Sequence, residues 1–580
     1  MRKSLAFTLT AVLILAIGIG GNTAMFTLIR TVLLKPLQYP DPDRLVRVSL
    51  DDLNQQRDGS FTLLRLEEMR ASAHSFSGIG AFLKFPEDVS LSRRGRPEAL
   101  KGARVSANFF DILGVKPLLG RSFLPQEDTP GGPAVAMISA RLWKGPFAGD
   151  RQTAGKTATL NSTPYTIIGV LPESFAFPFP GADVWLTKPA EWSVLLPRYW
   201  PHVTLLNGFA RLKPSASLDQ ARAEMDVLNR RYLLLHPERT DAKEGVTINL
   251  ALLSDHLVAK TRPTLWVLFG AVVFVLLIAC ANVAGLLLAR SNSRSREFAV
   301  RAAMGAPRSR LLRQLLLESL MLALAGGVAG VLLATWALKL IQYASAFNLP
   351  RVQETRLDGT MLGFTIALSI ATGILFGLLP SIKASRRDLA HELLAGGAGA
   401  ARGSSARRRM LGVNTRALLV VGQISLSIVL LVGAALLLES FARLRSVDPG
   451  FQPENLLTMK IALPPTRYDT DQKKTAFFRQ LVERVQAVPG VRNAAVALSI
   501  PTTLGWLGTN VLAQGQPLVD GAKQPSARLQ SVTPGYFRTL AIPLRRGREF
   551  TLRDNLPGAP AAAIINESFA RRFWPAYPRG

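Results

Sequence analysis

The chain has almost no cysteine and little histidine. Cys280 is the only cysteine among 580 residues, so no disulfide can form within the chain. The five histidines are scattered, and none stands at ligand spacing from another histidine, a cysteine or an acidic residue. The sequence also has no Gly-x-Ser-x-Gly and no His-Glu-x-x-His motif. We therefore predict that the chain is not an enzyme and holds no metal or cofactor.

A phosphate-binding loop is absent too, although one triplet resembles its end. Gly155-Lys156-Thr157 lies in "GDRQTAGKTATLNSTPYTIIGVLP" (149–172), but five residues separate Gly149 from Gly155 where such a loop has four. Two β-rich runs then flank a polar turn, which predicts a hairpin rather than a helix that would face a phosphate. Any ATP that drives this protein must be bound by another chain.

Acidic residues are few, whereas long apolar runs are frequent. The net charge is +29, and 48% of the residues are hydrophobic. Five segments reach the ~20 apolar residues that a membrane-spanning helix needs. They lie at about 5–28, 264–289, 314–343, 358–381 and 416–438. The first is too long for a signal peptide and no cleavage site follows it, so we expect a retained helix.

Basic residues gather beside these apolar segments. The loops 290–313 and 382–415 and the pair Arg2-Lys3 are rich in basic residues and contain few acids. The positive-inside rule places them, and with them the N-terminus, in the cytoplasm, where they also meet anionic lipid headgroups. No aromatic stacking platform is interleaved with the basic residues, so nucleic-acid binding is not expected. Residues 35–262 and 440–580 then lie outside the membrane.

An internal repeat organises the chain. "VSANFFDILGVKPLLGRSF" (105–123) aligns with "VTPGYFRTLAIPLRRGREF" (532–550) at an offset of 427, and the same offset pairs 135–143 with 562–570. We expect that the first span and its outer domain recur as the fifth span and a second outer domain, and that 532–570 superpose on 105–143. The second copy reaches only Gly580, so we expect three further spans of the repeat to be missing.

The outer regions mix helices and strands. Ser217 and Gln220 form a capping box, which predicts a helix that Pro237 ends. Its apolar stripe is expected at Leu218, Ala221, Met225, Leu228, Tyr232 and Leu235. A similar stripe at Phe477, Phe478, Leu481 and Val485 predicts a second helix, stopped by Pro489-Gly490. Residues 491–500 are then expected to form a strand.

The order of one helix, a domain of over 200 residues and three helices resembles the MacB/FtsX-like ABC permease family. The resemblance is carried by "LAIGIGGNTAMFTLIRTVLLKPLQYPDPDRLV" (15–46), 155–172, "NVAGLLLARSNSRSREFAVRAAMGAPRSRLLRQLLLES" (282–319) and "RFWP" (572–575). The repeated layout resembles the duplicated permeases known from Acidobacteria. The fold class implied is a membrane α-helical bundle with α+β extracytoplasmic domains, set in the bacterial inner membrane.

The resemblance also implies domain boundaries. They are a first transmembrane helix at 1–34, a MacB-like periplasmic core domain at 35–262, an FtsX-like permease domain at 264–381, a cytoplasmic linker at 382–415, a fifth transmembrane helix at 416–438 and a second, incomplete core domain at 440–580. The implied function is that of a mechanotransmitting export permease driven by a separate ATPase, with a periplasmic adaptor and an outer-membrane channel as further partners. The alternative is an FtsX-like regulator that transmits ATPase motion to a cell-wall hydrolase or sensor.

The cytoplasmic loop 290–313 is the candidate site for coupling to that ATPase. An amphipathic segment with apolar side chains precedes the helix-breaking Gly305-Ala306-Pro307. Such a segment can simply lie along the membrane surface, and that alternative stays open. The resemblance favours a coupling helix formed by Glu297, Phe298, Arg301, Met304 and Gly305.

Small residues are the candidates for close helix packing. They are Gly18, Gly20 and Gly21 in the first span, Gly326 and Gly330 in the third, and Gly373 and Gly377 in the fourth. The last two pairs have GxxxG spacing, which lets helix backbones approach closely, although it also occurs in ordinary membrane helices. The polar residues Asn22, Asn282 and Gln423 are expected to form hydrogen bonds between helices.

Overall fold

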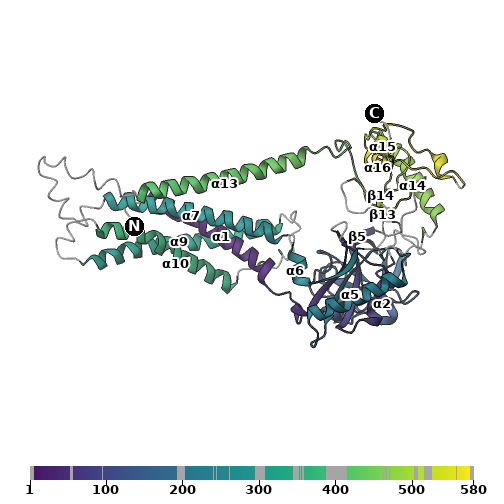
Figure 1. The fold of residues 1–580 in the computed structure, drawn as a ribbon, viewed down its shortest axis with the longest axis horizontal. Helices are drawn as coiled ribbons and strands as arrows, with labels where there is room; N and C mark the ends of the chain where they lie inside the picture. The colour runs from purple at the N-terminus through teal and green to yellow at the C-terminus, as the bar shows by residue number, and fades with distance from the viewer. Residues whose placement is uncertain are drawn as a thin grey trace. The chain divides into compact units, whose positions relative to one another are not determined.

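The computed structural model divides the chain into two compact units (Figure 1). The helical unit comprises Met1–Pro36 and Leu257–Ser446, and the sheet unit comprises Leu37–His256 and Val447–Gly580. The structure describes residues 5–52, 57–93, 96–191, 203–239, 241–242, 245–259, 261–293, 307–343, 352, 355, 358–386, 415–461, 463, 467–468, 470–501, 507–514, 526–556 and 558–574.

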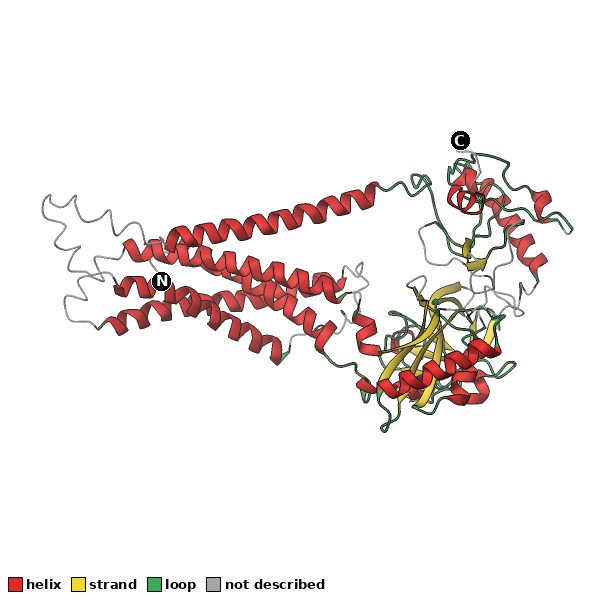
Figure 2. Ribbon diagram, in the orientation of Figure 1, coloured by secondary structure: helices red, strands yellow, loops and turns green. Residues whose placement is uncertain are grey.

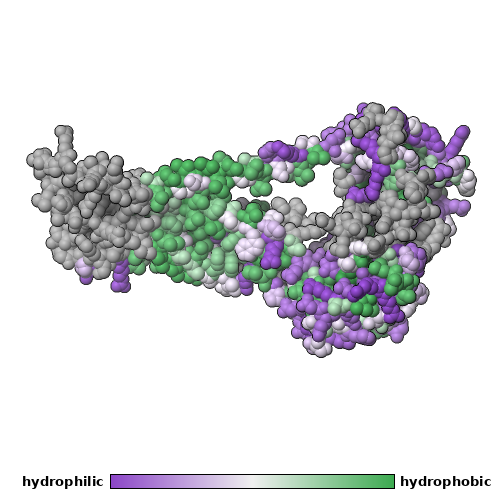
Figure 3. Space-filling model, viewed as in Figure 1, coloured by the Kyte–Doolittle hydropathy of each residue, from purple (hydrophilic) through white to green (hydrophobic). Residues whose placement is uncertain are grey.

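The five apolar segments predicted from the sequence are all helical. They form α1 (Leu5–Ile29), α7 (Arg262–Ser293), α9 (Arg308–Tyr343), α10 (Gly359–Arg386) and α13 (Thr415–Ser446). All five are long and apolar enough to cross a membrane, and a broad apolar surface covers this unit in Figure 3. With 36 residues, α9 is about 54 Å long and exceeds the ~30 Å hydrocarbon core. The helix is therefore longer than a membrane span requires.

Helix α1 is the central element of the helical unit. It contacts α7, α9 and α10 (Figure 1), and 61% of its most apolar window is buried, against 33% or less in the other four helices. A helix surrounded in this way cannot be amphipathic, so its sequence is apolar all round. At its end it widens into the π-helical turn η1 (Arg30–Leu34).

The sheet unit begins with an antiparallel sheet in the order β12-β1-β11-β3, with β2 paired to β1. The strands are β1 (Leu45–Asp52), β2 (Arg57–Gly59), β3 (Phe76–Leu83), β11 (Leu206–Leu212) and β12 (Val246–Leu252). Helices α2 (Leu63–Ser72) and α5 (Leu218–Leu235) share a hydrophobic core with this sheet (Figure 2). Because β1 and β12 are neighbours, with Val46 opposite Leu252, the first and last strands of Leu37–His256 lie side by side.

The predicted capping box is confirmed at the start of α5. Ser217 Oγ accepts from the amide of Gln220, whose side chain accepts from the amide of Ser217, at 3.2 and 2.9 Å. Ala221, Met225 and Tyr232 are buried as expected. Leu235 is not part of the stripe: it is 56% exposed, because the helix ends there and its last turn lies beyond the sheet contact.

A second, mixed sheet has the order β6-β9-β7-β10-β5-β4-β8. Its strands are β4 (Glu87–Arg93), β5 (Arg96–Arg104), β6 (Leu119–Gly120), β7 (Val135–Ser139), β8 (Thr157–Leu160), β9 (Thr163–Leu171) and β10 (Val184–Leu186). The predicted hairpin is confirmed, since β8 and β9 pair across a turn at Asn161 and Ser162. Lys156 therefore leads into a strand, and its Nζ lies 2.5 Å from Asp150 Oδ2. No helix follows Gly155 to face a phosphate.

The C-terminal region, residues 447–574, contains short elements. They are α14 (Asp471–Gln486), β13 (Leu507–Asn510), β14 (Ser526–Leu529), α15 (Tyr536–Thr539), η8 (Leu552–Asn555) and α16 (Glu567–Phe573). Helix α14 agrees with the prediction, but the predicted strand over 491–500 is wrong. Only an isolated bridge joins Ala497 to Val532. A β-rich sequence becomes a strand only when a partner continues the ladder, and this segment pairs over three residues at most.

Local structure recurs at the offset found in the sequence. Helix α3 (Phe109–Leu113) corresponds to α15, and each is followed by a left-handed residue, Gly114 (φ 69°) and Ala541 (φ 53°). Arg121 binds Glu127 as Arg548 binds Asp554, with shortest N–O distances of 2.5 and 2.6 Å. The acids stand in the turns η3 (Pro125–Asp128) and η8, which are related by the same offset.

Gly120 permits a test of how closely two strands approach. Its φ is +79°, and a Cβ there would overlap the carbonyl oxygen of Ile168 in β9. Gly131 has the similar φ of +77° with nothing within 4 Å. Both substitutions to alanine carry the cost of a left-handed backbone, but only Gly120→Ala must also move a strand. We expect Gly120→Ala to destabilise the protein by ~2 kcal/mol more than Gly131→Ala.

The measurement is denaturant unfolding of the two purified variants, followed by tryptophan fluorescence because Trp185 is fully buried in this unit. Equal losses of unfolding free energy in the two variants would show that Gly120 and Ile168 lie further apart than in the structure.

Candidate functional site

The predicted coupling residues Glu297, Phe298, Arg301, Met304 and Gly305 lie outside the described residues. The helices on both sides of them are described. Helix α7 ends at Ser293, and α9 begins at Arg308, directly after Pro307. Arg310 and Arg313, in the first turns of α9, are exposed. The candidate site can therefore be followed from the two helices that this loop connects.

The backbones of α1 and α9 touch at two glycines. A Cβ on Gly20 would lie 2.7 Å from the carbonyl oxygen of Gly330, and one on Gly326 would lie 2.6 Å from Leu15 Cβ. Such distances are shorter than van der Waals contact. The helices can pack this closely only because these positions carry no side chain.

Helices α9 and α10 interlock through two serine–glycine pairs. Ser319 of α9 faces Gly377 of α10, and Ser369 of α10 faces Gly327 of α9. Ser319 Oγ also donates to the carbonyl oxygen of Gly373, at 3.1 Å. In each helix the serine precedes the glycine by eight residues. Because the helices run antiparallel, the same eight-residue spacing places each serine against the glycine of the other helix. The two helices therefore fit closely together.

Helix α7 contacts a different face of α1. Gly18 faces Leu276 and Ala279, and a Cβ on Gly21 would lie 3.1 Å from Val272 Cγ1. Asn22, which is 2% exposed, donates to the carbonyl oxygen of Val272 at 2.9 Å. This is the kind of inter-helix hydrogen bond expected for Asn22. The structure thus places all seven selected glycines at contacts between helices.

Three contacts join α1 to α10 towards the C-terminal end of α1. The hydroxyls of Thr23 and Thr365 are 3.0 Å apart, and the rings of Phe26 and Phe364 stack at 3.9 Å. Beyond them, Arg30 Nη1 donates to Asp358 Oδ2. This hydrogen bond from Arg30, together with one from the amide of Met361, lowers the pKa of the Asp358 carboxyl. Sequence reasoning missed this contact because its two residues are more than 300 positions apart.

The N-terminal end of α1 is joined to the end of α7. The guanidinium of Arg290 lies 4.7 Å from the centroid of the Phe7 ring, within the range of a cation–π interaction. Arg290 is the first residue of the loop 290–313, which the sequence predicts to be cytoplasmic.

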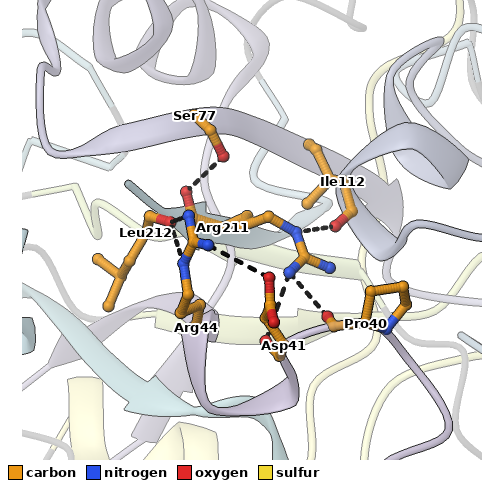
Figure 4. A network of polar contacts seen from close by, with 7 residues as sticks. All are labelled: Pro40, Asp41, Arg44, Ser77, Ile112, Arg211 and Leu212. Atoms are coloured by element: carbon orange, nitrogen blue, oxygen red, sulfur yellow. Dashed lines mark hydrogen bonds and ion pairs between the residues drawn. The ribbon is translucent and has the colours of Figure 1, made fainter. Parts of the chain in front are cut away.

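Two arginines fix the segment through which the chain enters the sheet unit (Figure 4). Arg211 of β11 donates from Nη1 to the carbonyl oxygen of Pro40 at 2.8 Å, and from Nε to that of Ile112 at 2.7 Å. Arg44 donates to the carbonyl oxygen of Leu212 at 2.7 Å. Its Nη1 also lies 3.2 Å from an Asp41 carboxylate oxygen. The entry segment is thus part of the sheet unit's rigid structure.

Nothing in the described part of the chain suggests a reactive centre. Among those residues, no group of three or more His, Cys, Asp or Glu side chains is placed to hold a metal ion. Asn22 and the buried hydroxyls of Thr23, Ser319 and Ser369 are hydrogen-bonded to helix backbones or to another hydroxyl. In this part of the chain α1 is thus held by close backbone contacts and hydrogen bonds to its neighbouring helices.

Comparison with known proteins identifies two family regions. Residues 8–228 match the family described as the MacB-like periplasmic core domain. Residues 269–389 match the family described as the FtsX-like permease C-terminal region. The first match includes most of α1 and most strands of the two large sheets, and the second includes α9, α10 and most of α7.

Curated relatives include export proteins. The pyoverdine export ATP-binding/permease protein PvdT of Pseudomonas syringae pv. syringae (strain B728a) is 27% identical over 290 residues, which are 47% of this chain and 39% of that protein. The macrolide export ATP-binding/permease protein MacB of Rhodospirillum rubrum is 29% identical over 279 residues, which are 47% of this chain and 40% of that protein. The chain thus spans about two fifths of the length of these relatives.

Solved structures are similar to a smaller part of the chain. The periplasmic region of MacB from Actinobacillus actinomycetemcomitans is 14% identical, covers 40% of this chain and 95% of that structure, and has a TM-score of 0.28. The extracellular domain of the ABC-type transporter YknZ from Gram-positive bacteria is 15% identical, covers 35% of this chain and 99% of that structure, and has a TM-score of 0.26.

The close approach of α1 and α9 can be tested with a pair of glycine variants. Gly20→Leu places a side chain where the backbone of Gly330 lies, whereas Gly363→Leu in α10 has nothing within 4 Å of its Cβ. Overpacking of this kind costs ~1–3 kcal/mol. We therefore expect Gly20→Leu to lower the thermal unfolding midpoint of the detergent-solubilised protein by several degrees and Gly363→Leu to leave it unchanged. Equal midpoints for both variants would contradict the backbone contact.

Proposed function

From the premise that the chain belongs to the MacB/FtsX family of ABC-type permeases, we propose that it is the permease subunit of a mechanotransmitting export system. The ATPase is a separate chain bound on the cytoplasmic side. Its motion is carried along α1 to the sheet unit, which lies in the periplasm. An adaptor and an outer-membrane channel would be partners there. The export role is supported by the names of the curated relatives.

The observation that carries the proposal is the short connection after α1. The last hydrogen bond of η1 joins the amide of Lys35 to the carbonyl oxygen of Arg30, at 2.7 Å. Tyr39 already packs against Phe175 of the sheet unit, with ring centroids 6.4 Å apart. Only three residues lie between Lys35 and Tyr39, and they span about 10 Å when fully extended. So short a connection absorbs little motion, and a displacement of α1 is passed on.

The path back to the membrane is also structured. Strand β12 leads into α6 (Leu253–Val258). Arg47 Nη1 of β1 lies 2.6 Å from His256 Nδ1 of that helix. Thr261 then caps α7, since its carbonyl oxygen accepts from Leu265 and its amide donates to Val258. The connections of Leu37–His256 to α1 and α7 therefore leave from the neighbouring strands β1 and β12. Relative movement of α1 and α7 would act on the β1–β12 pair.

Motion rather than passage of cargo through the bundle is supported by the buried polar groups. In the described helical unit these groups are Asn22, Thr23, Thr27, Thr31, Ser319, Thr355, Thr365, Ser369 and Thr372. Charged side chains within a span would mark an ion or substrate path, and none of these groups is charged. An FtsX-like regulator that moves no cargo would have the same property, so it remains the alternative function. Neighbouring genes for an adaptor and channel would favour export, and genes for a hydrolase or histidine kinase would favour regulation.

We further propose that the chain contains two copies of the helix-plus-core-domain unit. The support is the recurrence, at one constant offset, of the α3 turn, the left-handed residue and the arginine–acid pair. The rings of Phe110 and Phe123 lie 5.8 Å apart, and those of Phe537 and Phe550 lie 6.5 Å apart. On this basis α13 is the counterpart of α1, and residues 440–580 belong to a second core domain.

The ATPase contact is assigned to Glu297, Phe298, Arg301, Met304 and Gly305 in the loop between α7 and α9. Met304→Asp would place a charge in an apolar contact, whereas Met304→Leu preserves volume and polarity. Truncating a buried interface anchor commonly costs about 2 kcal/mol or more. We therefore expect at least a tenfold lower recovery of the ATPase with Met304→Asp and unchanged recovery with Met304→Leu.

The measurement is affinity purification from native membranes at equal membrane levels of each variant, with mass spectrometry of the co-eluting proteins. Recovery of an ABC ATPase with wild type supports the permease role, and its absence contradicts it. Equal recovery by Met304→Asp would instead remove the coupling role of this loop and leave the surface-helix alternative.

A further inference from the structure

We propose that Arg30 and Asp358 form a releasable contact that positions the end of α1 against α10 and so controls how η1 leads into the sheet unit. The inference deepens the proposed function, because it names the pair that determines whether α1 and α10 move together at this end. It concerns residues within the helical unit alone.

The contact links two helix ends through one carboxylate. Asp358 Oδ2 accepts from Arg30 Nη1, while Oδ1 accepts from the amide of Met361 at 2.9 Å. Asp358 therefore caps the first turn of α10 and holds α1 at the same time. Arg30 is the first residue of η1, and its carbonyl oxygen closes that π-helical turn. A change at this one pair acts on the start of α10 and on the end of α1.

The pair is the last of three aligned contacts. Thr23, Phe26 and Arg30 stand three and four positions apart, which places them on one face of α1. They meet Thr365, Phe364 and Asp358 in turn. After Arg30 the turn widens and the chain leaves the bundle at Lys35. The pair thus stands where the shared face of α1 and α10 ends.

Exposure distinguishes this contact from the others. The side chains of Arg30 and Asp358 are 31% and 43% exposed, whereas Thr23 and Thr365 are buried. Asp358 precedes the apolar span Gly359–Gly377, and Arg30 stands in the last turns of the span Leu5–Leu34, so the pair lies at the edge of both spans. Ion pairs that water can reach contribute little net stability, because water competes for both charges. The Arg30–Asp358 pair can therefore open without unfolding the bundle. The backbone contacts of α1 with α9 cannot open in this way, because Gly20 and Gly330 are packed without free space.

The turn between them is suited to changing shape. π-helical turns are rare in proteins, and those that occur are frequently found at functional sites. Ile29 and Val32 pack with Val352, which belongs to the connection between α9 and α10. Gln342 of α9 donates to the carbonyl oxygen of Thr355 in the same connection, at 2.9 Å. Apolar packing thus holds one side of η1 in place. The Arg30–Asp358 ion pair is the polar contact of this turn that can open.

The test measures the position of η1 relative to α10 in the full chain. Spin labels are placed on cysteines at the exposed positions Leu34 and Leu362, with Cys280 replaced by serine, and distances are measured in lipid nanodiscs. Arg30→Gln and Asp358→Asn remove the charges, and asparagine still caps a helix. We expect each to broaden the distance distribution at least twofold. Arg30→Lys keeps the charge and should retain a narrow distribution.

Two comparisons complete the test. Glu439→Gln removes the acid of another exposed ion pair, with Arg443 of α13, and should leave the distribution unchanged. Raising the salt concentration screens exposed pairs and should broaden the wild-type distribution but not that of Arg30→Gln. Unchanged widths in both charge-removing variants would overturn the inference. So would equal broadening in Arg30→Lys or Glu439→Gln.

The failure of this inference can be told apart from failure of the proposed function. The distance measurement needs no ATPase, so its result is independent of the affinity purification. With the wild-type ATPase recovered but no broadening, the pair has no positioning role and the permease role stands. With broadening but no ATPase in the wild-type purification, the pair positions α1 and the permease role fails.

Discussion

The contact between the backbones of α1 and α9 at Gly20 and Gly330 is the constraint on which the helical unit depends. Because the two helices meet without side chains between them, α1 sits deep enough to touch α7 and α10 as well. Only at that depth can Asn22 reach the carbonyl oxygen of Val272 and Thr23 reach Thr365. The central position of α1, on which the proposed transmission path depends, therefore follows from the absence of side chains at Gly20 and Gly330.

Local patterns in the sequence predicted much of the fold. The five apolar segments, the capping box at Ser217 and the hairpin after Lys156 each depend on residues close together in the chain. The predictions failed where distant partners decide. Residues 491–500 have the composition of a strand, yet they pair only near Val532, and Leu235 keeps the helical spacing but lies past the sheet. Burial and strand pairing are properties of the neighbourhood, which spacing alone does not specify.

The candidate site was predictable in part for the same reason. Composition identified the glycines as small residues within spans, but not which helix each one faces. The serine–glycine pairs had a visible signal, since an eight-residue spacing recurs in Ser319–Gly327 and Ser369–Gly377. The contacts of Arg30 with Asp358 and of Arg211 with Pro40 had no such signal in the sequence, because each joins residues more than 150 positions apart. Ion pairs and backbone hydrogen bonds of this kind become visible only once the helices and strands are placed.

Rigidity changes along α1, and this change gives the helix its proposed role. Its middle is fixed by backbone contacts that leave no space for sliding, whereas its C-terminal end is held by an exposed ion pair and apolar packing at Val352. On the other side of the connection, Arg211 and Arg44 hold the entry segment by hydrogen bonds to backbone carbonyl groups. A displacement imposed at the Phe7–Arg290 end cannot be taken up in the packed middle or in the fixed entry segment. On the proposed function it is therefore passed on through η1 and the few residues after it, which is where the two helix ends share Asp358.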